Sequence, residues 1–240
     1  MASILGKNVD VLVDEFDLTS YFNDSTVAKT AAVAEDTAYG DDSQTFIAGL
    51  RTHTISLSGF FDSASDGSDE ELQALVGVAN VVTLCPEGHQ TIGNPAFLGE
   101  QLETSYQASA PVGDVVSISA EMQGTGDTGN WGKVLHILTA EGSSTDNTTV
   151  DDGSPTTNGA VAILHMTANA HDNTTDIEVQ HSTNDSTWTT LASFTQIAAT
   201  TKTSEVQRTA DGGNVYRYVR TSSTLAGSGN VTYEVSLARK

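Results

Sequence analysis

The most constraining feature of this chain is a run at residues 51–58 in which two kinds of side chain alternate strictly. One face carries Arg51, His53, Ile55 and Leu57, and the other carries Thr52, Thr54, Ser56 and Ser58. A period of two is typical of an antiparallel strand that buries one face and exposes the other. The acidic residues before it, with glycines at 40 and 49, predict a long loop over residues 34–50 that only a partner would order.

Similar patterns predict a mainly β fold for the rest of the first half. We expect strands over residues 3–14, 81–84, 115–123 and 133–139, the third with Val116, Ile118, Ala120 and Met122 facing inward. One short flanking helix is expected in the segment D-G-S-D-E-E-L-Q-A-L-V-G. Ser68 would be its N-cap, Glu71 would complete a capping box, and Gly77 would end it.

A polar stretch then divides the chain. Residues 142–159 are rich in Ser, Thr, Asp and Gly, which predicts an interdomain linker between a β domain at 1–141 and a second domain at 160–240. After the linker, strands are expected over 160–168, 177–182, 188–194, 215–221 and 231–237, with Val231, Tyr233, Val235 and Leu237 on one face. Short strands separated by turns predict a C-terminal β-sandwich of jelly-roll or Ig-like type.

The charge is extreme and uneven. The net charge is −21, and residues 151–240 hold nine acidic and six basic side chains, so residues 1–150 carry −18 of it. Such a surface argues against a protein that tracks phosphates or docks on an anionic membrane. Three interpretations stay open: plain solubility, the wall of a channel through which DNA slides without sticking, and the acidic surface of a high-salt protein.

Motifs for chemistry are weak. Gly124, Gly126 and Gly129 spell G-x-G-x-x-G, but a strand follows where a dinucleotide site needs a helix, which favours a β-hairpin loop. Asp127-Thr128-Gly129 lacks the apolar flanks of an aspartic protease, and the acids at 62–71 lack calcium-loop spacing. The single cysteine, Cys85, is expected to be buried in a strand. The sequence therefore predicts no catalytic residues, no metal site and no cofactor.

No run of the sequence has the length of a membrane span, and the first ten residues lack the apolar core of a signal peptide. We therefore expect a protein that does not enter a membrane and leaves its host by another route, such as release inside a virion.

The segment from Thr37 to Asp62 resembles a pattern of major tail tube proteins in siphovirus-like, long-tailed phages and related archaeal tailed viruses. The residues that match are Thr37, Tyr39, Gly40, Asp41, Thr45, Phe46, Gly49, Leu50, Arg51, Ile55, Ser56, Leu57, Gly59, Phe60, Phe61 and Asp62. Residues 17–22, D-L-T-S-Y-F, are similar to the opening of these proteins. Residues 178–191 and 216–221 resemble, more loosely, the jelly-roll-like domains appended to some phage tail proteins.

This resemblance implies a tail tube β-sandwich or barrel that closes into homohexameric rings. Stacked rings would form a hollow, negatively lined conduit for genome delivery in the virion, assembled in the host cytoplasm. Partners would be other copies of the chain and the tape measure, tail terminator and distal tail proteins, with viral DNA passing through unbound and no membrane involved. The implied contact loop between subunits or rings contains Glu35, Asp36, Thr37, Tyr39, Gly40, Asp41, Asp42, Phe46, Ile47, Gly49 and Leu50.

Two other classes of protein stay open. One is a capsid decoration protein or another virion surface protein. The other is a carbohydrate-binding β-sandwich module, for which Trp188 and Tyr216 are the candidate aromatic residues. An enzyme is not expected, because no nucleophile–base pair or metal constellation is present in the sequence.

Overall fold

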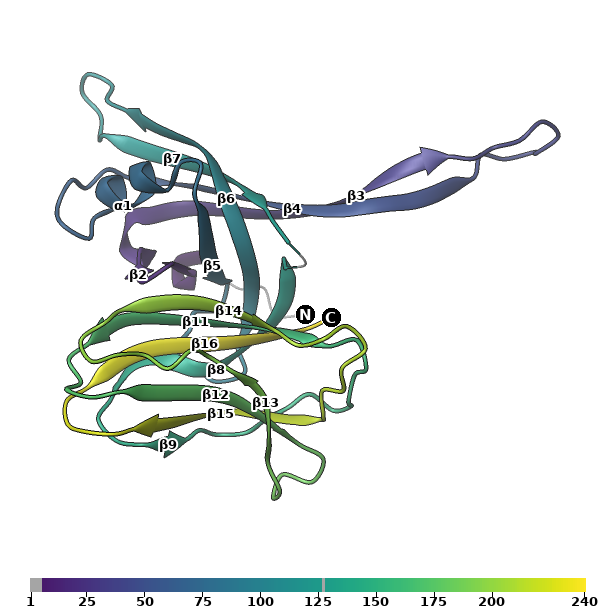
Figure 1. Ribbon diagram of the computed structural model, residues 1–240. Coiled ribbons are helices and arrows are strands. Elements are labelled where there is room, and N and C mark those ends of the chain that lie inside the picture. Colours follow the sequence, from purple (N-terminus) through teal and green to yellow (C-terminus); the bar gives the residue numbers. More distant parts are fainter. Residues whose placement is uncertain (1–5, 127) are drawn as a thin grey trace. The chain divides into compact units, whose positions relative to one another are not determined.

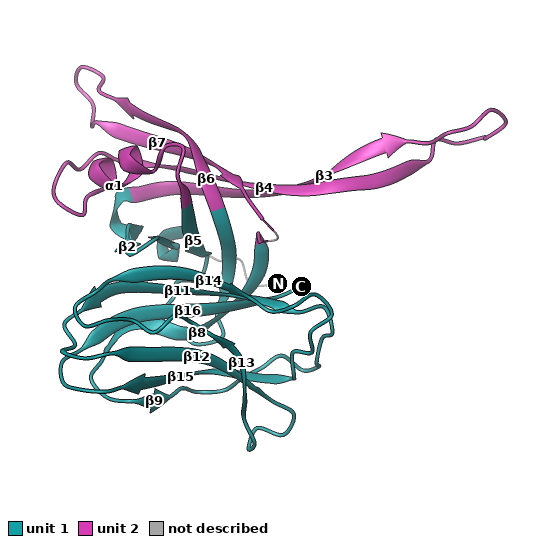
Figure 2. Cartoon of the chain, in the orientation of Figure 1, with its two compact units in different colours: residues 1–21, 80–100, 130–240 teal, residues 22–79, 101–129 magenta. Residues whose placement is uncertain are grey.

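The computed structural model describes residues 6–126 and 128–240, and it is mainly β with one α-helix, as the sequence predicts (Figure 1). Two compact units are present. Unit 1 consists of Met1–Tyr21, Asn80–Glu100 and Asn130–Lys240, and unit 2 consists of Phe22–Ala79 and Gln101–Gly129 (Figure 2).

Unit 2 is built on an antiparallel sheet in the order β3-β4-β7-β6. The strands are β3 (Phe22–Glu35), β4 (Phe46–Phe60), β7 (Ser117–Gly124) and β6 (Pro95–Ser109), whose first residues belong to unit 1. The period of two predicted for residues 51–58 is confirmed from residue 53 onward, because His53, Ile55 and Leu57 are buried, whereas Arg51 is exposed. Ile118, Ala120 and Met122 of β7 face the same way, as expected, whereas Val116 lies before the strand and is only half-buried.

The helix α1 (Ser68–Leu75) lies against this sheet, where the Tyr106 hydroxyl of β6 donates to Asp69 Oδ1 at 2.6 Å. The capping box expected from Ser68 and Glu71 is wrong, because the N-cap is Gly67 and has no side-chain cap bond. The Ser68 hydroxyl is used elsewhere: it donates to the Phe60 carbonyl at 2.8 Å and ties the end of β4 to the helix. The helix ends before Gly77 as predicted, and Gly77 has a φ of 81°.

Unit 1 is a β-sandwich of two antiparallel sheets. Its first sheet runs β14-β11-β16-β8-β6-β5-β1-β2, and its second runs β10-β15-β12-β13 with β9 also on β15. The bounds are β1 (Asp10–Val13), β2 (Phe16–Asp17), β5 (Ala79–Cys85), β8 (Asn130–Glu141), β9 (Thr145–Asp146), β10 (Val150–Asp151), β11 (Ala160–Asn169), β12 (Thr175–Ser182), β13 (Thr189–Ser193), β14 (Thr203–Arg208), β15 (Tyr218–Leu225) and β16 (Val231–Arg239). Short 3-10 helices cover Gly6–Asn8 and Thr19–Tyr21.

Strands β11 and β16 are buried on both faces. On one face, residues such as Leu164 and Tyr233 pack against Ile177, Val179 and other residues of the second sheet. On the opposite face, Ile163 and Ala238 pack with Cys85, Ala96 and Leu98 of β5 and β6, so the first sheet curls back over itself. This double burial explains why β11 reads as an almost continuous apolar run instead of alternating.

Two ionisable groups are buried within these layers. The His165 ring donates from Nδ1 to the Asp14 carbonyl at 2.7 Å, and Nε2 accepts from the Thr83 hydroxyl at 2.8 Å. Burial lowers the pKa of His165 to about 4, so the ring is neutral at neutral pH. Glu234 accepts from the Ser236 hydroxyl at Oε1, while Oε2 has no hydrogen-bond partner among the described residues. Burial raises the pKa of Glu234 to about 8.

Several predicted boundaries differ from those observed. Of the strand expected over 3–14, residues 3–5 lie outside the described residues and 6–8 form a 3-10 helix, because Gly, Lys and Asn are poor strand formers. The predicted linker at 142–159 contains β9 and β10, both paired with β15. Strand β16 pairs with both β11 and β8, so residues 130–141 belong to the same unit as residues 160–240. The division into domains at 1–141 and 160–240 stays a prediction: it states that each of these two fragments folds on its own.

The buried Glu234 predicts a specific dependence of stability on pH. Its pKa is raised in the folded state, so the stability that it contributes is complete below the unfolded pKa of about 4.5 and declines as the pH rises toward about 8. Glu234→Gln keeps the shape and the acceptor for Ser236 but removes the titration. We expect the variant to gain stability relative to the parent by up to about 1.4 kcal/mol per pH unit across this window, measured by urea unfolding. Parallel pH profiles for the two proteins would contradict this.

Candidate functional site

The candidate site is the arm, which we define as residues 29–52 of the β3–β4 hairpin. It extends beyond β7 and β6 of its own unit (Figure 1). Strand β4 pairs with β3 as far as the Glu35–Phe46 pair, but it pairs with β7 only from Thr54 to Phe60. Every residue of the arm is exposed. The arm is therefore a two-stranded ribbon with both faces and both edges open, an arrangement that is marginally stable by itself in water.

The arm carries apolar side chains despite its exposure. Phe46 is 57% exposed, Ile47 58% and Leu50 88%. Phe46 and Ala48 lie on one face of the ribbon, and Val33, which pairs with Ala48, joins them there. The register shift at residues 49–50 places Leu50 on the other face, which Ile47 also shares. Contiguous exposed apolar side chains of this kind mark an interaction surface.

Local hydrogen bonds order the tip of the arm. The Asp36 N–H donates to the Thr45 carbonyl at 3.0 Å, and the Ala38 N–H donates to Asp41 Oδ2 at 2.8 Å. The Thr45 N–H donates to the Thr37 hydroxyl at 3.1 Å, and Gly40 has a φ of 103° that suits glycine. The expected loop over 34–50 is therefore wrong in extent, because only residues 36–45 lie outside the two strands.

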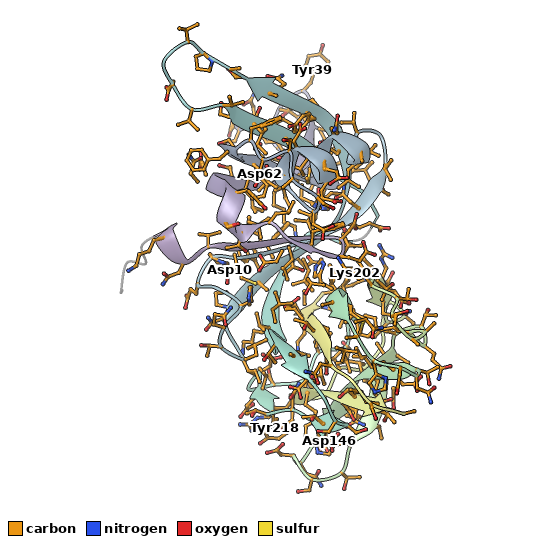
Figure 3. All side chains as sticks on the ribbon, turned by 90° about the vertical axis from the view of Figure 1, so that its left-hand side faces the viewer. Asp10, Tyr39, Asp62, Asp146, Lys202 and Tyr218 are labelled. Atoms are coloured by element: carbon orange, nitrogen blue, oxygen red, sulfur yellow. The ribbon has the colours of Figure 1, made fainter. Side chains whose placement is uncertain are left out.

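All eleven residues of the predicted contact loop lie on this arm. Tip residues are Asp36, Thr37, Tyr39, Gly40, Asp41 and Asp42, and strand residues are Glu35, Phe46, Ile47, Gly49 and Leu50. Tyr39 is labelled in Figure 3 and is fully exposed. The sequence reasoning missed Val33, because β3 has no alternating pattern that would identify it as a strand. The role of the eleven predicted residues in contacts between subunits stays a prediction.

At the point where the arm begins, the ring of His53 packs against two glycines, Gly124 and Gly129, which we call the glycine slot. His53 is the last buried residue of β4 before the arm begins, and a Cβ built on Gly124 or Gly129 would overlap its ring. The side-chain amide of Gln123 donates to the Thr52 hydroxyl and, at 3.1 Å, to the His53 carbonyl. These contacts fix the point at which β4 leaves the sheet.

Gly124 and Gly129 of the G-x-G-x-x-G motif thus have a structural role, because they leave room for the His53 ring. A strand follows it, as predicted, but the expected hairpin is wrong because β7 pairs with β4 and β6 while β8 pairs with β16 and β6. Asp127 of the D-T-G triplet lies outside the described residues. Within residues 6–126 and 128–240, no cluster of three His, Cys, Asp or Glu residues is arranged to hold a metal ion. Nor does any helix in this part of the chain have the length and hydropathy to cross a membrane.

The exposed face of the unit 2 sheet is mostly polar, with the exposed Phe60 opposite Ser117 at its end. Alternation places Thr54, Ser56 and Ser58 of β4 beside Ser117, Ser119, Glu121 and Gln123 of β7 and Asp24, Thr26 and Ala28 of β3. The Ser56 hydroxyl donates to Glu121 Oε2. We call these ten residues the polar face. Its charged members are Asp24 and Glu121, both acidic.

The glycine slot gives a direct test. Gly124→Ala should place a methyl group inside the His53 ring and destabilise the protein by about 1–3 kcal/mol, as overpacking does. Gly6→Ala is the control, because a Cβ at Gly6 meets nothing within 4 Å. Chemical denaturation of the two variants measures the effect, and equal stability would show that the slot is not tight.

Comparison with known proteins gives no family. No family model matches the sequence, and no curated protein does. Among solved structures, a chain in the virion of a native gene transfer agent particle is similar at 17% identity, covering 53% of this chain and 98% of its own, with a TM-score of 0.43. The tail of an empty gene transfer agent particle, refined with C6 symmetry, contains one at 18% identity, covering 52% and 96%, with a TM-score of 0.42. The Dit protein of phage SPP1, a hub of the adsorption apparatus, is similar at 14% identity over 96% of this chain and 98% of its own, with a TM-score of 0.35. Overlaps at this level do not assign the chain to a family.

Proposed function

We propose that this protein is a structural component of a virion tail, whose copies form hexameric rings that stack into the tail tube. The observation that carries the proposal is the exposed arm, which presents the apolar side chains of Val33, Phe46, Ile47 and Leu50. The tail tube pattern in residues 37–62 supports it. The proposed partners are other copies of the chain and other tail proteins, and the proposed place is the tail of the virion.

The physical reason for the proposed assembly is that the arm of a single chain leaves apolar side chains and a strand edge exposed. Each large apolar side chain gains roughly 1.5–3 kcal/mol when it is fully buried against a partner. Strand β3 pairs only with β4 among the described residues, so its outer edge also offers free backbone groups to another strand. Contacts between different patches of identical subunits close into rings or continue as filaments, and a stack of rings uses both outcomes.

The polar face would line the inner wall of such a ring. Hydroxyl and amide groups with acidic Asp24 and Glu121 offer no cation to bind DNA phosphates. DNA would therefore pass without sticking, since phosphate binding depends on neutralisation by Lys and Arg.

The arm is tested by Phe46→Ala combined with Ile47→Ser. Both side chains are exposed in the single chain, so the variant should fold with nearly unchanged stability but fail to polymerise. Negative-stain microscopy and sedimentation of concentrated protein measure polymerisation, and circular dichroism with thermal unfolding measures folding.

The matched control is Val112→Ser, an apolar side chain outside the arm that is more exposed than Phe46 or Ile47. It should polymerise like the parent. If the double variant forms tubes as well as the parent does, the arm is not the contact between rings. Parent protein that never forms rings or tubes, even with tail-initiating components, would reject the proposed function.

The inner wall is tested by reversing its charge with Asp24→Lys and Glu121→Lys. Assembled tubes of this variant should retain DNA at low salt and release it as salt rises, because counterion release drives such binding. DNA that co-sediments with tubes provides the measurement. The control is Asp185→Lys with Asp211→Lys, two exposed acids of unit 1. DNA retention by the control tubes alone would place the polar face outside the channel.

A further inference from the structure

The second sheet of unit 1 has an outer face made of hydrogen-bonding side chains. Ile177, Val179 and Val219 point into the sandwich core, so their strand neighbours point away from it. The register then sets three outward pairs side by side: Asp176 with Thr224, Glu178 with Ser222, and Gln180 with Arg220. We call these six residues the outer strip.

The side chains of the outer strip hold one another in fixed positions. Gln180 donates to Glu178 Oε1 at 2.6 Å, and its own Oε1 accepts from Arg220 Nε and Nη2 at 2.9 and 2.7 Å. Arg220 also pairs with Asp146 of β9 at 2.9 Å, and Glu178 Oε2 accepts from the Thr190 hydroxyl at 2.8 Å. Groups that are already oriented lose little conformational freedom when a ligand binds. Asp146 is labelled in Figure 3, together with Tyr218 of the neighbouring strand.

The strip has a hollow at one end and an aromatic ring at the other. The hollow encloses about 300 Å³ and is lined by Asp176, Ile177, Glu178, Ser193, Phe194, Ser222 and Thr224. At the opposite end the Arg220 guanidinium lies 4.4 Å from the centre of the Trp188 ring. Trp188, a candidate from the sequence, is thus part of this face, whereas Tyr216 stacks on His181 at 4.3 Å instead.

The side chains of the outer strip favour some classes of ligand over others. The outward side chains of the strip are polar, which is unlike the apolar centre of a protein interface. Its acids, Asp176 and Glu178 with Asp146 beside them, outnumber the single Arg220, which disfavours nucleic acid and anionic lipid. Ionised carboxylates only accept hydrogen bonds, and their two oxygens match a pair of neighbouring hydroxyl groups. The volume of the hollow lies at the small end of the range for ligand pockets.

We propose that the outer strip binds a neutral oligosaccharide. One sugar occupies the hollow and donates its hydroxyl groups to Asp176 and Glu178, while Ser222 and Thr224 supply further hydrogen bonds. The chain of sugars runs along β12 and β15 toward Gln180 and Arg220, and a later sugar packs on Trp188. This site is independent of the arm, so its function does not require ring assembly.

The test is titration of the full chain with three neutral probes: chitotriose, maltotriose and cellotriose. Binding is followed by isothermal calorimetry and by amide NMR shifts of residues 176–180 and 220–224. At least one probe should bind, with shifts confined to the outer strip. Glu178→Gln should weaken this binding at least about tenfold, because a hydrogen bond to a charged group is lost. Trp188→Ala should weaken it as well.

The matched control is Asp211→Asn, an exposed carboxylate that pairs with Lys240 and lies outside the strip. It should bind like the parent. Should Glu178→Gln fail to fold, as judged by circular dichroism, Trp188→Ala alone decides. The proposal is overturned if none of the three probes binds at millimolar concentration, or if folded Glu178→Gln and Trp188→Ala bind like the parent. Tighter binding of trilysine than of any sugar would also overturn it and indicate a cationic ligand.

Discussion

The asymmetric pairing of β4 is the constraint on which the proposed function depends. On one side β4 pairs with β3 along nearly its whole length, and on the other it pairs with β7 only from Thr54 to Phe60. The paired half is held by the core through Ile55 and Leu57, while the other half has no layer to cover it. His53 marks the change, because its ring fills the slot at Gly124 and Gly129. The same strand is therefore a core element at one end and an unpartnered surface at the other.

Where one face of a strand meets a core, the sequence was sufficient to predict the structure. Residues 51–58 alternate because His53, Ile55 and Leu57 are buried and their neighbours are not. Strand β11 was also identifiable, since burial on both faces requires apolar side chains in succession. Seven of the eleven residues of the candidate site belong to the tail tube pattern, and the other four were chosen for their charge or apolar character: Glu35, Asp36, Asp42 and Ile47. All eleven lie on the arm. What they contact stays a prediction.

The features that could not be predicted from the sequence are of two kinds. Some depend on contacts with residues far away in the chain, and others lie in strands whose apolar and polar residues do not alternate regularly. Strand β3 is exposed for most of its length, so nothing selects alternating apolar residues there. Strand β6 is interrupted by a register shift between Glu103 and Ser105, which breaks its period. The glycines at 124 and 129 had no visible reason, because the ring that requires them belongs to His53 on a different strand. The outer strip of unit 1 likewise consists of ordinary polar residues until the register of β12 and β15 brings them together.

The arm contains one irregularity with a geometric consequence. Between the pairs Ala31–Arg51 and Val33–Ala48, strand β4 contains one residue more than β3. Gly49 and Leu50 together lie opposite Ala32, and a Cβ on Gly49 would be 3.3 Å from Ala32. A bulge of this kind increases the local right-handed twist of a ribbon. The apolar face of the tip is consequently rotated about the ribbon axis relative to the sheet that carries it. In a stack built through such arms, the angle between one ring and the next would be set by this single additional residue. Helical symmetry of the whole particle would then be encoded at Gly49 and Leu50 of β4.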